Sequence, residues 1–322
     1  MKKYFSLLYK QLFNFLISVS CHFNLPAFCA YLIKISLFKP KLFRKKIKSK
    51  KIFIVLYREI GIRDIEIIHK SANSNFEFLF LRRSITKIIL FCFCNRKKFF
   101  FNYLNYPTTV EDYFNQNLNN KKNHEKFWIE VMSNLKKYFN NKTLNFITFN
   151  FDYYAEAALY VGCNKNNIAV KLWHKEGIQT DLDGEYRMKT SMPKMRHMFK
   201  YFTDISVYNE RTKEKFIRLD EENSKKISVN GCPRIKDFIT NKKYYKKPRN
   251  ILFLSFDIRR GITKIKQNKD LSFKLSFNII VKILNELSDN KNLNIIAKYK
   301  HNSGDEINNQ ISKNIKIFKT GS

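Results

Sequence analysis

The chain has 322 residues, a formal net charge of +34, 44% hydrophobic residues and 16% aromatic residues. This hydrophobic content is typical of a packed globular protein and excludes an intrinsically disordered one. Six cysteines in so long a chain do not make a disulfide framework, and only 8 glycines and 6 prolines exclude collagen-like or low-complexity architectures.

The positive charge is concentrated at the start of the chain. Residues 1–58 contain 13 Lys and Arg residues and no Asp or Glu, because Glu59 is the first acidic residue. No zinc-finger spacing, RNA-recognition motif or basic-region heptad accompanies this charge, so we expect no specific nucleic-acid partner.

The first segment, residues 1–50, combines basic with apolar residues. Between Lys10 and Lys34 lie 23 residues without Lys, Arg, Asp or Glu, but polar residues interrupt this run and Pro26 breaks its helical pattern. Residues 39–51 interleave Lys and Arg with Leu, Phe and Ile, which suits an anionic membrane surface. Three interpretations stay open: attachment to the membrane surface, two short helices packed on the next domain, and a membrane span. We expect a cytoplasmic protein held peripherally on the inner face of the cell membrane.

From residue 51 onwards, short apolar runs alternate with helical patterns. This alternation predicts an α/β fold with a parallel, doubly wound sheet. We expect strands at 51–57, 76–81, 144–149, 168–173 and 227–229, an apolar segment at 85–93, a polar loop at 115–123, and helices near 63–70, 124–139 and 153–161.

A polar, charged linker at 241–249 separates the domain at 51–240 from a second α/β unit at 250–322. In the second unit the pattern predicts strands at 250–256, 293–298 and 315–318 and one helix at 271–287. A parallel sheet is normally covered by helices on both faces. We therefore expect the second domain to be incomplete and the chain to be a truncated or split polypeptide.

The richest group of polar residues follows the expected strand at 168–173. It consists of His174, Lys175, Glu176 and Gly177. Open α/β sheets bind ligands at the carboxyl ends of their strands, and histidine is the side chain best able to move a proton near neutral pH. His174 is therefore a candidate catalytic residue, although a lone histidine at such a place can also be structural.

Three further polar groups follow other expected strands. They are the turn at 231–237 with Arg234 and Asp237, the loop at 255–261 with Arg259, and residues 298–302 with Lys298 and His301. Backbone N–H groups and a guanidinium in the loop at 255–261 could hold an anionic donor. A rigid interdomain elbow with a surface salt bridge is the alternative interpretation of the turn at 231–237.

Other kinds of site lack their signatures. The glycine-rich motifs of dinucleotide-binding proteins and of P-loop nucleotide hydrolases do not occur, and the nucleophile elbow of the α/β-hydrolases is absent. Cys92 and Cys94 lie in an apolar run without a nearby histidine, and the other cysteines are scattered. We expect no metal and no cofactor.

The order of these groups carries a resemblance. Trp173-His174 with Gly177, then Gly231-Cys232-Pro233-Arg234 with Asp237, then a strand ending in Ser-Phe-Asp-x-Arg, then Lys-x-x-His, resembles the GT-B-type transferases of bacterial surface-polysaccharide biosynthesis. The pattern covers about residues 145–302 and is similar to the CDP-glycerol glycerophosphotransferases of teichoic-acid synthesis. In this chain Lys175 and Glu176 stand between the histidine and the glycine of the first motif.

The resemblance implies two facing Rossmann-like domains. It also implies transfer of a sugar, or of a glycerophosphate-like group, from a nucleotide-linked donor to a glycan or lipid-linked acceptor. By the same resemblance His174 would be the general base on the acceptor hydroxyl, with Glu176 also at the catalytic centre. The residues that would bind the donor or the acceptor are Lys175, Gly177, Arg234, Asp237, Arg259, Lys298 and His301. Two alternatives stay open: a sugar-nucleotide epimerase of the same architecture, and a non-catalytic basic module that binds membranes or nucleic acid.

Overall fold

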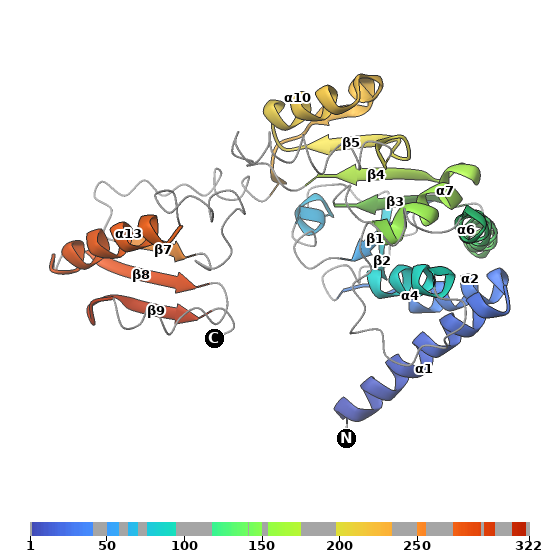
Figure 1. Ribbon diagram of the computed structural model, residues 1–322, viewed down its shortest axis with the longest axis horizontal. Coiled ribbons are helices and arrows are strands. Elements are labelled where there is room, and N and C mark those ends of the chain that lie inside the picture. Colours follow the sequence, from blue (N-terminus) through green and yellow to red (C-terminus); the bar gives the residue numbers. More distant parts are fainter. Residues whose placement is uncertain are drawn as a thin grey trace. The chain divides into compact units, whose positions relative to one another are not determined.

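The computed structural model describes twelve segments of the chain, and its two units each contain a parallel sheet (Figure 1). The two units are Met1–Thr240 and Asn241–Ser322. The described segments are 2–40, 50–57, 64–69, 76–94, 118–140, 142–149, 154–174, 198–233, 250–255, 273–290, 293–299 and 311–319.

The first unit is built on a six-stranded parallel sheet with the order β2-β1-β3-β4-β5-β6. The prediction of an α/β fold with a parallel sheet is therefore confirmed, and the first unit is Rossmann-like. The strands are β1 (Lys51–Tyr57), β2 (Phe76–Arg82), β3 (Thr143–Thr148), β4 (Ala169–Trp173), β5 (Asp204–Val207) and β6 (Ile227–Val229).

The central strand β1 is buried on both faces, because helices cover both faces of the sheet there. Along β1, Ile54 and Leu56 join a large core with the helices of one face, while Val55 joins a smaller core on the other. The larger core contains α2 (Pro26–Ser36), α4 (Arg83–Cys94), α6 (Leu118–Tyr138) and α7 (Ala157–Lys165). The short helix at 64–69 contributes Ile65 to the smaller core. Burial on both faces explains why β1 forms a continuous apolar run from Ile52 to Leu56.

One predicted boundary is wrong. The polar loop expected at 115–123 is already helical from Leu118, where α6 begins. Asn119, Lys122 and Asn123 lie on the exposed side of this first part of the helix. The buried side is continuous from His124 onwards, so tertiary packing overrides the weak helix propensity of the asparagines. The apolar segment at 85–93, whose type the sequence left open, is part of α4.

The first residues of the chain belong to the same unit. α1 (Lys2–His22) packs on α4, and α2 packs on α6. Ile17 of α1 and Ile33 of α2 are fully buried in the larger core. In the described segments, no helix combines the length and the apolar character needed to cross a membrane.

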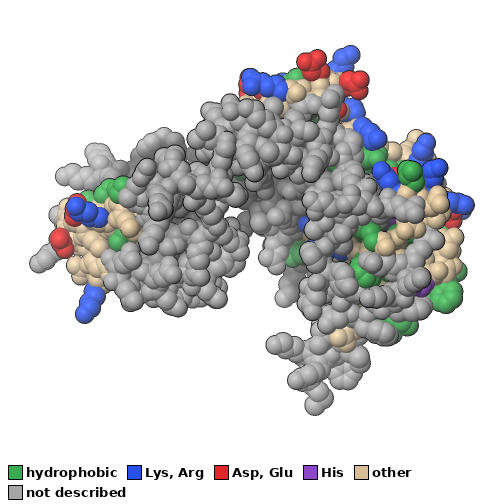
Figure 2. All heavy atoms as spheres, in the orientation of Figure 1, with side chains coloured by type: hydrophobic (Ala, Val, Ile, Leu, Met, Phe, Trp, Pro, Cys, Tyr) green, Lys and Arg blue, Asp and Glu red, His purple; other side chains and the backbone are tan. Residues whose placement is uncertain are grey.

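Between β5 and β6 the chain forms α10 (Glu210–Leu219) and a 3₁₀ helix, η3 (Glu221–Lys226). The Asn209 side chain caps α10 by accepting a hydrogen bond of 2.8 Å from the Thr212 backbone N–H. Figure 2 shows side chains of both charges over α10. Phe216 of α10 is buried in the larger core, where it lies next to the candidate site.

The second unit has three parallel strands in the order β7-β8-β9 and one described long helix. These elements are β7 (Asn250–Ser255), α13 (Phe273–Ser288), β8 (Asn294–Tyr299) and β9 (Lys316–Lys319). Val281 and Leu284 of α13 pack with Ile295 and Ala297 of β8 in a small core. All four elements lie close to the positions that the sequence predicts.

Candidate active site

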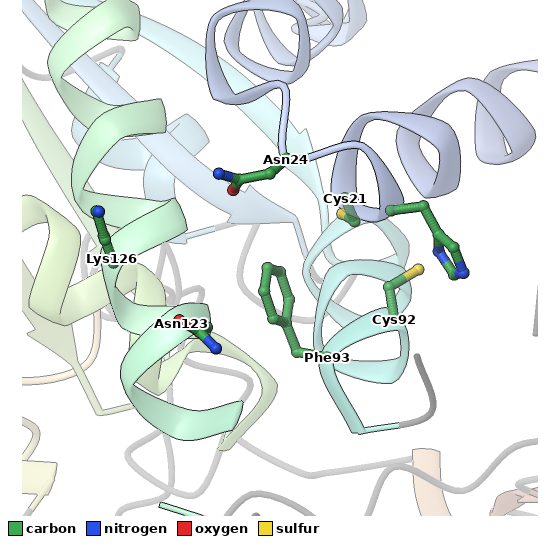
Figure 3. Close-up of a pocket in the computed structure, with 7 residues that line it drawn as sticks. Cys21, Asn24, Cys92, Phe93, Asn123 and Lys126 are labelled. Atoms are coloured by element: carbon green, nitrogen blue, oxygen red, sulfur yellow. The ribbon is translucent and has the colours of Figure 1, made fainter. Parts of the chain in front are cut away.

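Of the two cavities described for the first unit, the larger lies between helices and has a volume of about 330 Å³. Its lining residues are Cys21, His22, Asn24, Cys92, Phe93, Asn123 and Lys126 (Figure 3). Burial raises the pKa of Cys21 well above its usual value, whereas a hydrogen bond with Cys21 is the main cause that lowers the pKa of Cys92. Across the described segments, no group of three His, Cys, Asp or Glu side chains is arranged to hold a metal ion.

The smaller cavity, of about 250 Å³, lies at the carboxyl edge of the six-stranded sheet. Its walls come from the carboxyl ends of β4 and β5, from the residues that follow β4, β5 and β6, and from the helix at 64–69. The lining residues are Asp64, Ile68, Trp173, His174, Ser206, Val207, Tyr208, Asn230, Gly231 and Pro233. An apolar cavity with a few convergent polar groups, at strand ends where such sheets bind ligands, is the best candidate for an active site.

His174 is the first residue after β4, as the sequence predicts. Its backbone N–H donates a hydrogen bond of 2.8 Å to the carbonyl oxygen of Ser206, which ties it to β5. Its ring centroid lies 4.9 Å from that of Phe216, and the residue is only 2% exposed. The imidazole is therefore held in the cavity wall by packing, which gives it a fixed orientation.

Asp64 is a second titratable residue in this wall and is not among the predicted site residues. It is buried, and its Oδ2 accepts a hydrogen bond of 2.8 Å from the hydroxyl of Tyr208, the residue that follows β5. The sequence holds a signal for Asp64, because this residue follows the end of β1 by seven positions, and open α/β sheets gather ligand-binding groups after the ends of their strands. A buried carboxylate there can accept a hydrogen bond from a ligand hydroxyl.

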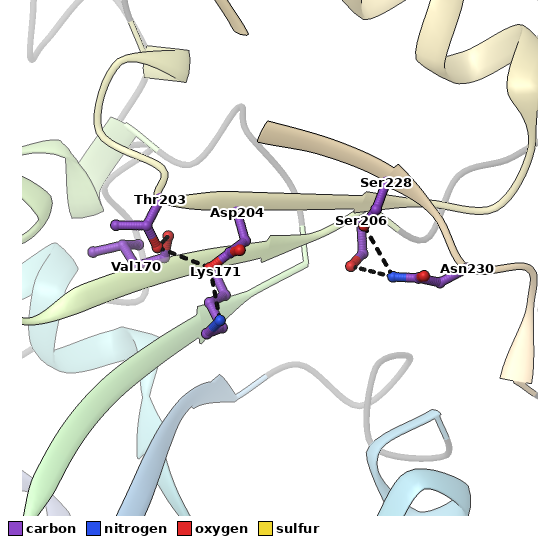
Figure 4. Close-up of polar contacts among 7 residues, drawn as sticks. All are labelled: Val170, Lys171, Thr203, Asp204, Ser206, Ser228 and Asn230. Atoms are coloured by element: carbon purple, nitrogen blue, oxygen red, sulfur yellow. Dashed lines mark hydrogen bonds and ion pairs between the residues drawn. The ribbon is translucent and has the colours of Figure 1, made fainter. Parts of the chain in front are cut away.

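The turn after β6 also lines the cavity, and Asn230 and Gly231 determine its shape. The Asn230 side-chain amide donates hydrogen bonds to the hydroxyls of Ser206, at 2.8 Å, and Ser228, at 3.1 Å (Figure 4). Gly231 follows with a φ of +69°, a left-handed conformation that favours glycine. The sequence predicts this turn, and the structure brings its first residues into the same cavity as His174.

Trp173 adds the aromatic part of the lining. It is the last residue of β4, half-buried, and packs against the smaller core. With Ile68, Val207 and Pro233 it makes much of the cavity surface apolar. An aromatic ring beside polar groups suits a ligand that has both apolar faces and hydroxyls.

The polar contact between Lys171 and Asp204 lies away from the cavity and is structural. The Lys171 ammonium is 2.6 Å from the Asp204 carboxylate, which also accepts a hydrogen bond of 3.2 Å from the Thr203 hydroxyl (Figure 4). Asp204 begins β5, at the opposite end from His174. Because Asp204 is largely exposed, this pair contributes little stability and mainly favours the register of β4 and β5.

Most of the other predicted site residues lie outside the described segments. Lys298 lies within β8, where only its backbone is described. The predicted residues outside the described segments are Lys175, Glu176, Gly177, Arg234, Asp237, Arg259 and His301.

Comparisons with known proteins add no relative. No protein-family model matches this sequence, and no curated protein matches it significantly.

Proposed function

We propose that the chain is a transferase of the GT-B type. It moves a sugar, or a glycerophosphate-like group, from a nucleotide-activated donor to a hydroxyl of a cell-surface glycan or lipid-linked acceptor. The observation that carries the proposal is the cavity at the carboxyl edge of the sheet, where His174 and Asp64 lie in one wall with Trp173. The motif order from Trp173 to His301 supports the same class of reaction.

In the proposed reaction the acceptor hydroxyl lies in the cavity, with its sugar ring against Trp173. His174 takes the hydroxyl proton as the oxygen attacks the anomeric carbon, or the phosphorus, of the donor. The bond from that atom to the nucleotide phosphate oxygen breaks, and the nucleotide leaves with the bonding electrons. Asp64, held by Tyr208, accepts a hydrogen bond from a second acceptor hydroxyl and so orients the acceptor.

The donor side belongs, in this proposal, to the second unit. Arg259 and His301 bind the donor phosphates and stabilise the charge that develops on the leaving nucleotide. By the resemblance to the GT-B-type transferases, Arg234 and Lys298 also belong to the residues that bind the donor or the acceptor. Positioning and charge stabilisation together account for most of the rate enhancement in such a reaction.

The first test is donor binding. Nucleotide mono- and diphosphates and nucleotide sugars are screened for those that raise the melting temperature, because a ligand of the native state stabilises it. Transfer to glycan acceptors is then measured with the donors that bind. His174→Ala should lower turnover by about 100-fold or more and leave the donor-induced shift unchanged. His22→Ala, a half-buried histidine outside this cavity, should stay within about twofold of the wild type.

Wild-type turnover by His174→Ala would make this histidine structural and overturn its assignment as base. Conversion of a nucleotide sugar without any acceptor would instead identify an epimerase. Salt-sensitive binding to DNA with no nucleotide affinity would identify a non-catalytic basic module.

We also propose that the enzyme works at the cytoplasmic face of the membrane. The support is the first segment, residues 1–50, with its excess of Lys and Arg over acidic residues. Each such cation near an anionic leaflet adds about 1 kcal/mol of attraction.

A further inference from the structure

Five apolar side chains are exposed together on α2 and on the turn before it. They are Phe23, Leu25, Phe28, Tyr31 and Ile35, and are referred to below as the α2 outer surface. Phe23 is 65% exposed and Ile35 is 50% exposed. Phe28, Tyr31 and Ile35 are three and four residues apart, so they lie on one side of the helix.

The exposed side of α2 differs from that of an ordinary surface helix, because it is apolar although the other side of α2 already packs on the core. Cys29, Ala30 and Ile33 are fully buried in the larger core, and α2 packs along α6. An amphipathic helix with such a core side would carry polar residues outside. α2 instead carries phenylalanine, tyrosine and isoleucine there, and contiguous exposed apolar residues mark an interaction surface.

Positive charge accompanies the α2 outer surface. Lys34 is exposed on the same helix, with its Nζ 4.9 Å from the ring centroid of Tyr138. Lys126 of α6 lines the larger cavity together with Asn24, which stands between Phe23 and Leu25 in the chain (Figure 3).

The neighbouring helix α6 also carries more basic than acidic residues. Its acidic residues are Glu125 and Glu130, and its lysines are Lys121, Lys122, Lys126, Lys136 and Lys137. Residues 1–58 add no acidic side chain. Over the part of the first unit formed by α2 and α6, Figure 2 shows hydrophobic side chains near Lys and Arg side chains.

We propose that the α2 outer surface docks on an anionic lipid bilayer. Phe23, Leu25, Phe28 and Ile35 enter the boundary between headgroups and acyl chains, and Lys34 stays among the lipid phosphates. Apolar groups next to cations, with few acidic residues nearby, fit this partner better than a neutral or basic protein. The inference rests on the proposed location at the membrane but not on catalytic activity.

The test uses the full chain and sedimentation with vesicles of phosphatidylcholine containing about one-third phosphatidylglycerol. The double variant Phe28→Ser, Ile35→Ser should lower the partition coefficient onto these vesicles at least about tenfold. The control is Ile283→Ser on α13, because Ile283 is 48% exposed and lies in the second unit. This control should bind as the wild type does.

A single, milder substitution tests the same surface if the double variant unfolds. Phe28→Trp should show a blue-shifted emission with these vesicles and quenching by lipids brominated near the headgroups. Sedimentation without any change at this tryptophan would overturn the α2 outer surface and leave attachment to residues 39–51. Absence of sedimentation would overturn the membrane location as well, while the transfer assay would remain an independent test of the enzyme. A dimer that the double variant abolishes would assign the surface to a second copy of the chain and overturn the lipid partner.

Discussion

The contact between α6 and α7 at Gly162 makes a demanding test of the packing. A Cβ added to Gly162 would lie 2.6 Å from the carbonyl oxygen of Trp128, 2.8 Å from its carbonyl carbon and 3.1 Å from Cγ of Met132. Trp128 is fully buried, and its carbonyl group belongs to the backbone of α6. A methyl group therefore cannot be accommodated by rotating a side chain.

The structure gives the size of the expected effect. The added Cβ must move about 0.8 Å from the Trp128 oxygen to reach an ordinary contact of 3.4 Å, so the two helices must separate. Overpacking of this kind costs about 1–3 kcal/mol, and the higher helix propensity of alanine returns about 1 kcal/mol. Because the clash is with the backbone, we take the upper end of the range and expect Gly162→Ala to lower the free energy of unfolding by about 2 kcal/mol.

The assay is equilibrium unfolding in urea, with a thermal melt in parallel. A loss of about 2 kcal/mol corresponds to a fall of about 4–8 °C in melting temperature for a unit of this size. Gly231→Ala is the matched control, since Gly231 has a φ of +69° but no heavy atom within 4 Å of an added Cβ. It should cost only about 1 kcal/mol, for the left-handed conformation. A Gly162→Ala variant as stable as the wild type, or more stable than the control, would refute the close contact.

Two further predictions concern buried ionisable residues. Glu156 is fully buried, and its Oε1 is 2.6 Å from Nε of Arg83, so Glu156→Gln should lower the free energy of unfolding in urea by about 2–3 kcal/mol. Glu210→Gln, which removes the exposed pair with Lys213, should lower it by less than about 0.5 kcal/mol. Equal losses in the two variants would contradict this prediction. Burial lowers the pKa of His124 to about 3 from its ordinary 6.5, so at acid pH only the unfolded chain binds this proton. The free energy of unfolding should therefore fall by about 1.4 kcal/mol per pH unit from pH 6.5 towards 3, and His124→Gln, measured by urea titration at several pH values, should lack this component.

The sequence predicts the strands well where burial on both faces makes them apolar, as along residues 52–56 of β1. It misses β5, Asp204–Val207, because this strand is short and alternates polar with apolar residues. It also places the start of α6 too late, since the pattern of buried residues that defines the helix begins only at His124. Local composition is a poor guide wherever packing decides the structure.

The residues of the candidate site can likewise be predicted from the sequence only in part. Trp173, His174 and the turn at Gly231 can be found from the sequence, because a parallel sheet brings successive strand ends to one edge. Asp64 also follows a strand, but its position in the wall depends on how the helix at 64–69 lies against Tyr208. No property of the residues around Asp64 specifies that partner.

The hydrogen bond between Asp64 and Tyr208 joins residues 144 positions apart, and this separation bears on how the protein matures. During synthesis the ribosome releases the helix at 64–69 long before β5 and β6, and nascent chains begin to fold from the N-terminus. The Asp64 carboxylate therefore stays hydrated, without its hydrogen bond from Tyr208, until more than half of the chain has emerged. Pairing over such a distance in sequence is slow. The pocket at the carboxyl edge is consequently expected to form late in the folding of the first unit, because a nascent fragment that ends before Pro233 lacks part of its lining.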